Sequence, residues 1–97
     1  MTLEVRFHPL AEADLEAIYD HIAADSHDNA IAYVRRLRQQ CLRLSFFPSR
    51  GHARRDLPPG VRAVVFERRT LIAYRREGER VVVLRLPCGG RDIEGAF

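Results

Sequence analysis

The spacing of apolar residues changes after residue 44 of this chain, and that change constrains the fold more than any other feature. Between residues 9 and 44 apolar residues recur three and four positions apart, as on one face of a helix, in two stretches separated by residues 25–28. From residue 61 onward they fall in short runs separated by turn residues, which is typical of strands. Helices followed by strands favour an α+β layer.

Both predicted helices carry end signals. His8-Pro9 predicts the first start, because proline tolerates the first helical position, where its missing N–H costs nothing. Residues 25–28 offer cap residues for the second helix, and Pro48 ends it. The apolar stripes are Leu15, Ile18, Tyr19 and Ile22 in the first helix, and Ala30, Tyr33, Val34, Leu37, Cys41 and Leu44 in the second. The short connection predicts antiparallel neighbours.

Strands are predicted at both ends of the chain. Leu3, Val5 and Phe7 alternate with polar residues and predict a short half-buried strand. After an exposed loop at 48–60, strands are predicted at 61–67, 70–76 and 80–86, joined by short turns into an antiparallel meander. The expected fold is one α+β domain over residues 1–97. Its N-terminal strand and antiparallel helical hairpin pack on one face of an antiparallel β-sheet, and the other face is open.

The arginines in the strands predict which residues face outward. Burying an unpaired arginine is costly, so the residues that share a face with Arg85 are expected to point away from the helices. Val81 and Val83 are therefore predicted to point outward with Arg85. Val82, Leu84 and Leu86 are predicted to point inward. The same argument places Arg6 and Arg75 on the open face and leaves Arg62 undecided.

The charge is unevenly distributed, and all 16 basic residues are arginines. Residues 1–31 carry seven acids and one arginine, a net charge of −6, whereas residues 32–97 carry fifteen arginines and six acids, a net charge of +9. These add to the total of +3. Codon usage in a GC-rich genome can explain the missing lysines, but it does not explain the asymmetry. The basic part favours an anionic partner, either a nucleic acid or an acidic protein segment.

Several classes of protein are disfavoured. The apolar runs are too short for a membrane span, and the N-terminus has no signal-peptide core, so a cytoplasmic location is expected. Cys41 and Cys88 form no C-x-x-C pair, and the four histidines lack the spacing of metal ligands, so no metal is expected. No glycine-rich phosphate loop is present, and no cofactor is expected.

Cleavage of RNA is an alternative that the arginines leave open. Guanidinium groups can hold phosphates and stabilise the charge that develops at a scissile bond. The candidates are Arg50, Arg54, Arg55, Arg62, Arg75, Arg85 and Arg91. A ribonuclease also needs a general acid and a general base, for which only His52 and Tyr74 are available near the basic region. Binding of an acidic peptide is therefore favoured over catalysis.

Four groups of residues, taken in order, resemble one family. They are Pro9, Ala11, Asp14-Leu15 and Ile18-Tyr19; Pro48-Ser49-Arg50-Gly51, Arg54, Leu57 and Gly60-Val61-Arg62; Tyr74-Arg75; and Arg91-Asp92-Ile93 with Phe97. In this order and spacing they resemble toxins of the RelE/ParE superfamily of type II toxin–antitoxin systems, and within it the ParE branch. The resemblance extends from residue 3 to residue 97.

The resemblance implies a mode of action and partners. ParE-branch toxins inhibit DNA gyrase, whereas RelE-branch toxins cleave mRNA on the ribosome. Cys88 occupies a place where many members have histidine, and the chain has no lysine, so a binding inhibitor without catalytic residues is favoured over an enzyme. A cognate antitoxin, ParD-like with a ribbon-helix-helix or similar domain, is implied in a hetero-oligomer. DNA contact is implied only through the antitoxin.

The resemblance and the charge pattern together suggest two sites. The antitoxin is expected to pair acidic groups with Arg54, Arg62 and Arg75, and to lay apolar side chains beside exposed parts of Tyr33 and Leu37. The expected gyrase-binding residues are Arg91, Asp92, Ile93 and Phe97. The alternative is a ribosome-dependent endonuclease with Arg54, Arg62, Arg75 and Arg85 around the phosphate. A third possibility is a non-toxic interaction module.

Overall fold

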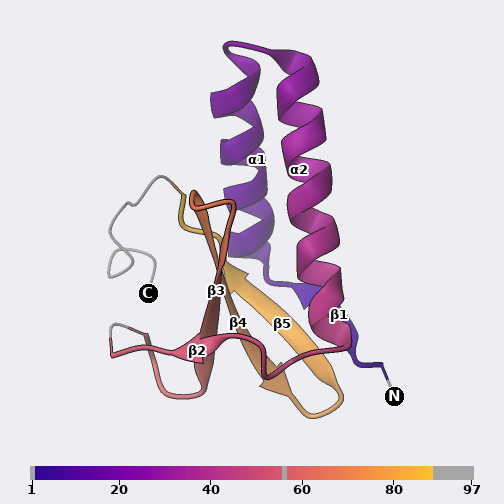
Figure 1. Ribbon diagram of the computed structural model, residues 1–97, viewed down its shortest axis with the longest axis vertical. Helices are drawn as coiled ribbons and strands as arrows, with labels where there is room; N and C mark the ends of the chain where they lie inside the picture. The colour runs from indigo at the N-terminus through magenta and orange to yellow at the C-terminus, as the bar shows by residue number, and fades with distance from the viewer. Residues whose placement is uncertain (1, 56, 89–97) are drawn as a thin grey trace.

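A helical hairpin beside a sheet forms the body of the protein. The computed structural model describes residues 2–55 and 57–88. The elements are β1 (Glu4–Phe7), α1 (Pro9–Ala23), α2 (His27–Leu42), the 3-10 helix η1 (Arg43–Ser45), β2 (His52–Ala53), β3 (Val61–Phe66), β4 (Thr70–Glu77) and β5 (Arg80–Arg85). Figure 1 shows α1 and α2 side by side, extending beyond the sheet. The predicted α+β fold is confirmed, and the last three strands begin and end within one residue of the prediction.

The sheet is mixed, whereas the sequence predicted an antiparallel one. Its strand order is β1-β5-β4-β3-β2, and β1 pairs with β5 in parallel. Parallel neighbours need a long connecting segment. Here that segment contains all the elements from α1 to β4 in sequence. The predicted loop also contributes a strand, because His52 and Ala53 pair with Ala63 and Arg62. Alternation alone does not reveal which strands become neighbours.

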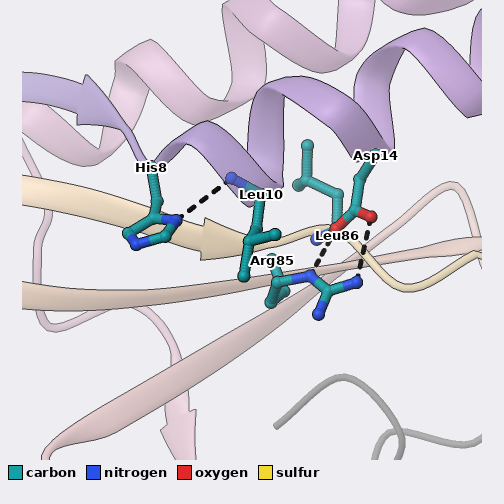
Figure 2. A network of polar contacts seen from close by, with 5 residues as sticks. All are labelled: His8, Leu10, Asp14, Arg85 and Leu86. Atoms are coloured by element: carbon teal, nitrogen blue, oxygen red, sulfur yellow. Dashed lines mark hydrogen bonds and ion pairs between the residues drawn. The ribbon is translucent and has the colours of Figure 1, made fainter.

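Side-chain caps set where the helices begin, as the sequence predicted. His8 precedes α1, and its Nδ1 accepts a hydrogen bond from the Leu10 amide at 3.1 Å (Figure 2). Ser26 precedes α2, and its hydroxyl accepts from the Asn29 amide at 3.2 Å. The connection between the helices is braced by a 2.7 Å hydrogen bond between the Tyr19 hydroxyl and His27. These contacts fix the hairpin before any packing on the sheet is considered.

Two apolar clusters lie on opposite faces of the sheet. The larger one joins the helical stripes to the sheet and contains Ala11, Leu15, Ile18, Tyr33, Leu37, Cys41, Leu44, Ile72, Tyr74, Val81, Val83 and Leu86. The smaller one contains Leu57, Val61, Ala63, Leu71 and Ala73, with Leu84 packed against it. The face expected to be open is therefore partly covered, because the loop before β3 places Leu57 on it.

The predicted orientation of β5 is wrong for Val81, Val83 and Leu84, whereas Leu86 lies on the helix side as predicted. Val81 and Val83 are fully buried in the helix-side cluster, and Leu84 packs on the other face. Arg85 consequently points toward α1 rather than to the open face. The prediction assumed an unpaired arginine, but Arg85 has an acidic partner, so its position on the helix side carries no unpaired charge. Arg75 does lie on the other face, since its neighbour Tyr74 belongs to the helix-side cluster.

The partner of Arg85 is Asp14 of α1 (Figure 2). The Asp14 carboxylate accepts hydrogen bonds from Arg85 Nε at 2.9 Å and from Arg85 Nη2 at 3.1 Å. It also accepts one from the backbone amide of Leu86 at 2.8 Å. The hydrogen bond to Asp14 raises the pKa of the Arg85 guanidinium. One acidic residue of the helical half thus holds the end of the last strand.

The loop after α2 is attached to the sheet by the hydroxyl of Tyr74. This hydroxyl donates a hydrogen bond to the Pro48 carbonyl at 2.9 Å and accepts one from the Gly51 amide at 2.7 Å. A Cβ at Gly51 would lie 2.6 Å from the Tyr74 hydroxyl oxygen and 3.0 Å from the Ala63 carbonyl oxygen. The chain can approach Tyr74 this closely only with glycine at position 51. Residues 48–51 are therefore held against β4.

Replacing Asp14 with alanine is expected to lower the free energy of unfolding by about 2–3 kcal/mol, because the Arg85 guanidinium and the Leu86 amide both lose their acceptor. Denaturant unfolding followed by circular dichroism measures the loss. Glu16→Ala, at an exposed position of the same helix, is the control and should change stability by less than about 0.5 kcal/mol. Equal effects of the two substitutions would contradict the role of Asp14.

Replacing Gly51 with alanine is expected to destabilise the protein by about 1–3 kcal/mol, because the added methyl group overlaps Tyr74 and the Ala63 carbonyl. The same unfolding measurement applies. Ser49→Ala, at an exposed position of the same loop, should have little effect. A Gly51→Ala protein as stable as wild type would show that the loop does not need its close approach to Tyr74.

Candidate functional site

Arg54, Arg62 and Arg75 come from neighbouring segments at one end of the sheet. Arg54 follows β2, whose Ala53 pairs with Arg62 on β3, and Val61 on β3 pairs with Arg75 on β4. Their side chains take different directions. Arg62 Nη1 donates to the Gly51 carbonyl at 2.8 Å, whereas Arg75 lies on the other face of the sheet and pairs with Glu77 at 2.6 Å. A partner that meets both Arg62 and Arg75 has to extend around this end of the sheet.

Three of the four arginines of the nuclease alternative are bound to different partners. Arg62 is directed to the Gly51 carbonyl, Arg75 to Glu77 on the other face, and Arg85 to Asp14. The candidate acid Tyr74 is buried, and its hydroxyl is engaged by Pro48 and Gly51. Burial raises the pKa of this hydroxyl, which favours the protonated form that donates to Pro48. Arg62, Arg75, Arg85 and Tyr74 are thus each engaged in contacts within the fold.

Tyr33 and Leu37 lack the exposed parts that the sequence analysis expected. Tyr33 is 4% exposed and Leu37 is fully buried, because the apolar stripe of α2 packs directly on the core. The Tyr33 ring is also covered by two cations, since the guanidinium carbons of Arg36 and Arg69 each lie 5.5 Å from its centroid. The expectation of exposed parts on these two side chains is therefore wrong, and contact of a partner with them stays a prediction.

The described part of the chain ends at Cys88. Its Sγ accepts a hydrogen bond from the Thr70 hydroxyl at 3.3 Å, and Thr70 is in turn bonded to the Tyr33 hydroxyl at 2.6 Å. Hydrogen bonds thus connect Cys88, through Thr70, to the buried Tyr33. The residues expected to contact the target, Arg91, Asp92, Ile93 and Phe97, lie outside the described residues.

An apolar surface at the C-terminal end of α2 was missed by the sequence analysis. Among the described residues, Leu42, Phe46 and Phe47 are more than half exposed, at 52%, 62% and 64%. A hollow of about 630 Å³ lies beside them and is lined by Phe46, Phe47, Pro48, Ser49 and Arg50. We call Leu42 and these five residues the α2 corner. The signal in the sequence was a Phe-Phe pair just before a predicted exposed loop, within a stretch that carries only arginine charges.

Within residues 2–55 and 57–88, no group of three or more His, Cys, Asp or Glu side chains is placed to hold a metal ion. None of the helices in that part of the chain is both long and apolar enough to cross a membrane.

Comparisons with known proteins agree with this architecture. Residues 5–93 match the family described as "ParE toxin of type II toxin-antitoxin system, parDE". A chain from the chromosomal ParDE system of P. aeruginosa is 28% identical, with a TM-score of 0.79, over 91% of this chain and 97% of that chain. A chain from the RelBE2 toxin–antitoxin complex of Mycobacterium tuberculosis is 26% identical, with a TM-score of 0.58, over 91% of this chain and 99% of that chain.

The search of curated proteins returned no match. The family match nevertheless spans most of the 97 residues and includes, apart from Glu4 of β1, the helices and strands of the described residues. The similar chain from P. aeruginosa is aligned over nearly its whole length. The protein therefore belongs to the ParE toxin family of type II toxin–antitoxin systems.

Proposed function

We propose that this ParE-family protein is a toxin that inhibits DNA gyrase by binding it, and that a cognate antitoxin neutralises it. The observation that carries the proposal of binding over cleavage is the separation of Arg62, Arg75 and Arg85 toward different partners. A nuclease needs converging cationic groups with an acid and a base. A binding inhibitor needs only a surface. The proposed target sets the site of action in the cytoplasm.

The proposed antitoxin contacts use the arginines at one end of the sheet. Carboxylates of the antitoxin pair with Arg54, Arg62 and Arg75, since a guanidinium group binds a carboxylate through two parallel hydrogen bonds. Arg62 and Arg75 lie on opposite faces of the sheet, which supports a segment that wraps around this end. At Arg75 an antitoxin carboxylate would compete with Glu77. Contact with DNA would come from the antitoxin.

The proposed gyrase contacts are Arg91, Asp92, Ile93 and Phe97, which lie outside the described residues. They follow the last strand in sequence, whereas the proposed antitoxin arginines lie in β3, in β4 and after β2. Separate surfaces for the target and the antitoxin would allow substitutions to affect one and spare the other. Substitutions among the proposed gyrase contacts are therefore expected to spare antitoxin binding, and substitutions among the antitoxin arginines to spare gyrase inhibition.

Purified toxin is expected to inhibit supercoiling of relaxed plasmid by DNA gyrase and to leave ribosome-bound mRNA intact. Phe97→Ala is expected to raise the half-inhibitory concentration about tenfold, the effect of losing roughly 1.4 kcal/mol at one aromatic contact. Leu10→Ala, an exposed position on α1, serves as the control. Codon-specific cleavage of mRNA with normal supercoiling would instead show a ribosome-dependent endonuclease. Normal growth on induced expression would show a non-toxic interaction module.

Arg75→Glu is expected to weaken binding of the antitoxin by more than about 1.5 kcal/mol, because a charge-assisted contact becomes a repulsive one. Isothermal titration calorimetry measures the change, with the purified product of the neighbouring reading frame, where the family resemblance implies that the antitoxin is encoded. Arg68→Glu makes the same charge change in the exposed β3–β4 turn and should leave the affinity within threefold of wild type. Equal affinities of wild type and Arg75→Glu would remove Arg75 from the site.

A further inference from the structure

The α2 corner owes its exposure to the backbone path after α2. Cys41 and Leu44 fill the inward positions of this segment and are buried. The chain then turns through η1, where the Phe46 amide donates to the Arg43 carbonyl at 3.1 Å. With the inward positions occupied, the two following phenylalanines point outward. Their exposure is therefore built into the fold.

The corner is also held in one shape. The Arg50 amide donates to the Phe47 carbonyl at 3.1 Å, closing a turn over Phe47 and Pro48. The Tyr74 hydroxyl fixes the carbonyl of Pro48 and the amide of Gly51 on either side. A surface whose backbone is already ordered loses little conformational entropy when a partner binds. Exposed apolar side chains on such a backbone are characteristic of binding hot spots.

Along the sequence the charge around the corner is of one sign. Residues 29–55 contain seven arginines and no acidic residue, and Arg43 and Arg50 lie within or beside the corner itself. Across the fold, the Leu3 amide donates to the Ser45 carbonyl at 3.0 Å and brings β1 beside η1, where the carboxylate of Glu4 is paired with Arg6. Other exposed apolar residues have acids close in sequence: Leu10 lies two residues before Glu12, and Val65 two before Glu67. A partner that suits this corner combines apolar side chains with carboxylates.

We propose that the α2 corner seats an apolar side chain from an acidic segment of the cognate antitoxin, with Phe46 and Phe47 as its anchors and Arg50 as the charged contact. The proposal rests on the proposed neutralisation by an antitoxin and adds the apolar half of that interface. Tyr33 and Leu37 are buried and offer much less apolar surface than Phe46 and Phe47. Arg62, whose guanidinium bonds to the Gly51 carbonyl, connects the corner to the proposed arginine contacts.

The test compares variants in calorimetric titrations with the purified product of the neighbouring reading frame. The double variant Phe46→Ser, Phe47→Ser is expected to raise the dissociation constant at least ~30-fold, as for a hot-spot pair. Arg50→Glu is expected to raise it at least ~10-fold, with a smaller effect at high salt. Val65→Ser, at a side chain 61% exposed on β3, should stay within threefold of wild type. Thermal unfolding checks that each variant is folded, and Arg50→Glu tests the corner independently of the serines.

Each contrary result overturns the proposal in a different way. A double variant that binds the antitoxin within threefold of wild type but no longer inhibits gyrase would assign the corner to the target. A wild-type dimer that the two serines dissociate would assign it to a second copy, and loss of binding to a single-stranded RNA 20-mer would assign it to RNA. If wild-type protein inhibits gyrase but does not bind the neighbouring product at all, the proposed antitoxin itself is wrong. That result can be told apart from tight antitoxin binding that is the same in wild type and in the corner variants, which would contradict only the role of the α2 corner.

Discussion

The hydroxyl of Tyr74 links strand β4 to the loop after α2, and through that loop to β2 and β3. It sits in the helix-side core on β4 and reaches the loop after α2 through Pro48 and Gly51. That loop continues into β2, which pairs with β3, and Arg62 on β3 bonds back to the Gly51 carbonyl. The position of the α2 corner and of the arginines beside it therefore depends on one buried phenol and on a glycine small enough to approach it.

Ion pairs connect the acidic N-terminal helix to the arginine-rich remainder. Asp14 binds Arg85 and the Leu86 amide across the helix–sheet boundary, and Glu12 pairs with Arg38 at 3.0 Å across the hairpin. These contacts use part of the positive charge that the sequence concentrates after residue 31. The uneven charge thus stabilises contacts between the N-terminal helix and the rest of the fold. An anionic partner would meet the arginines at the end of the sheet and around the α2 corner.

Local signals in the sequence predicted most of the elements. Pro9 and Ser26 mark helix starts because caps and ring constraints act within a few residues. The short apolar runs after residue 61 mark strands, which pack on both faces of the sheet. What the sequence could not supply was long-range pairing. The parallel partner of β1 and the Asp14 partner of Arg85 depend on segments more than 70 residues apart, and the wrong face of β5 follows from that missing partner.

The candidate site was predictable only in part for the same reason. The helical period placed Tyr33 and Leu37 on the apolar stripe, and because that stripe packs on the core, both side chains are buried. Phe46 and Phe47 carry no periodic signal, because they follow the last helical turn. Their exposure follows from Leu44 being buried and from the loop being fixed at Tyr74, which are tertiary facts. The arginines were predicted as a group, but their faces were not.

Amide hydrogen exchange at Gly51 tests the central claim most directly, because that amide donates to the Tyr74 hydroxyl. In wild-type protein the Gly51 amide is predicted to exchange slowly, as do the core amides of β4. In Tyr74→Phe it is predicted to exchange at least ~10-fold faster, since the acceptor is gone while the ring still fills the core. A Gly51 amide that exchanges rapidly in wild type, or equally slowly in both proteins, would contradict a loop held in place by Tyr74.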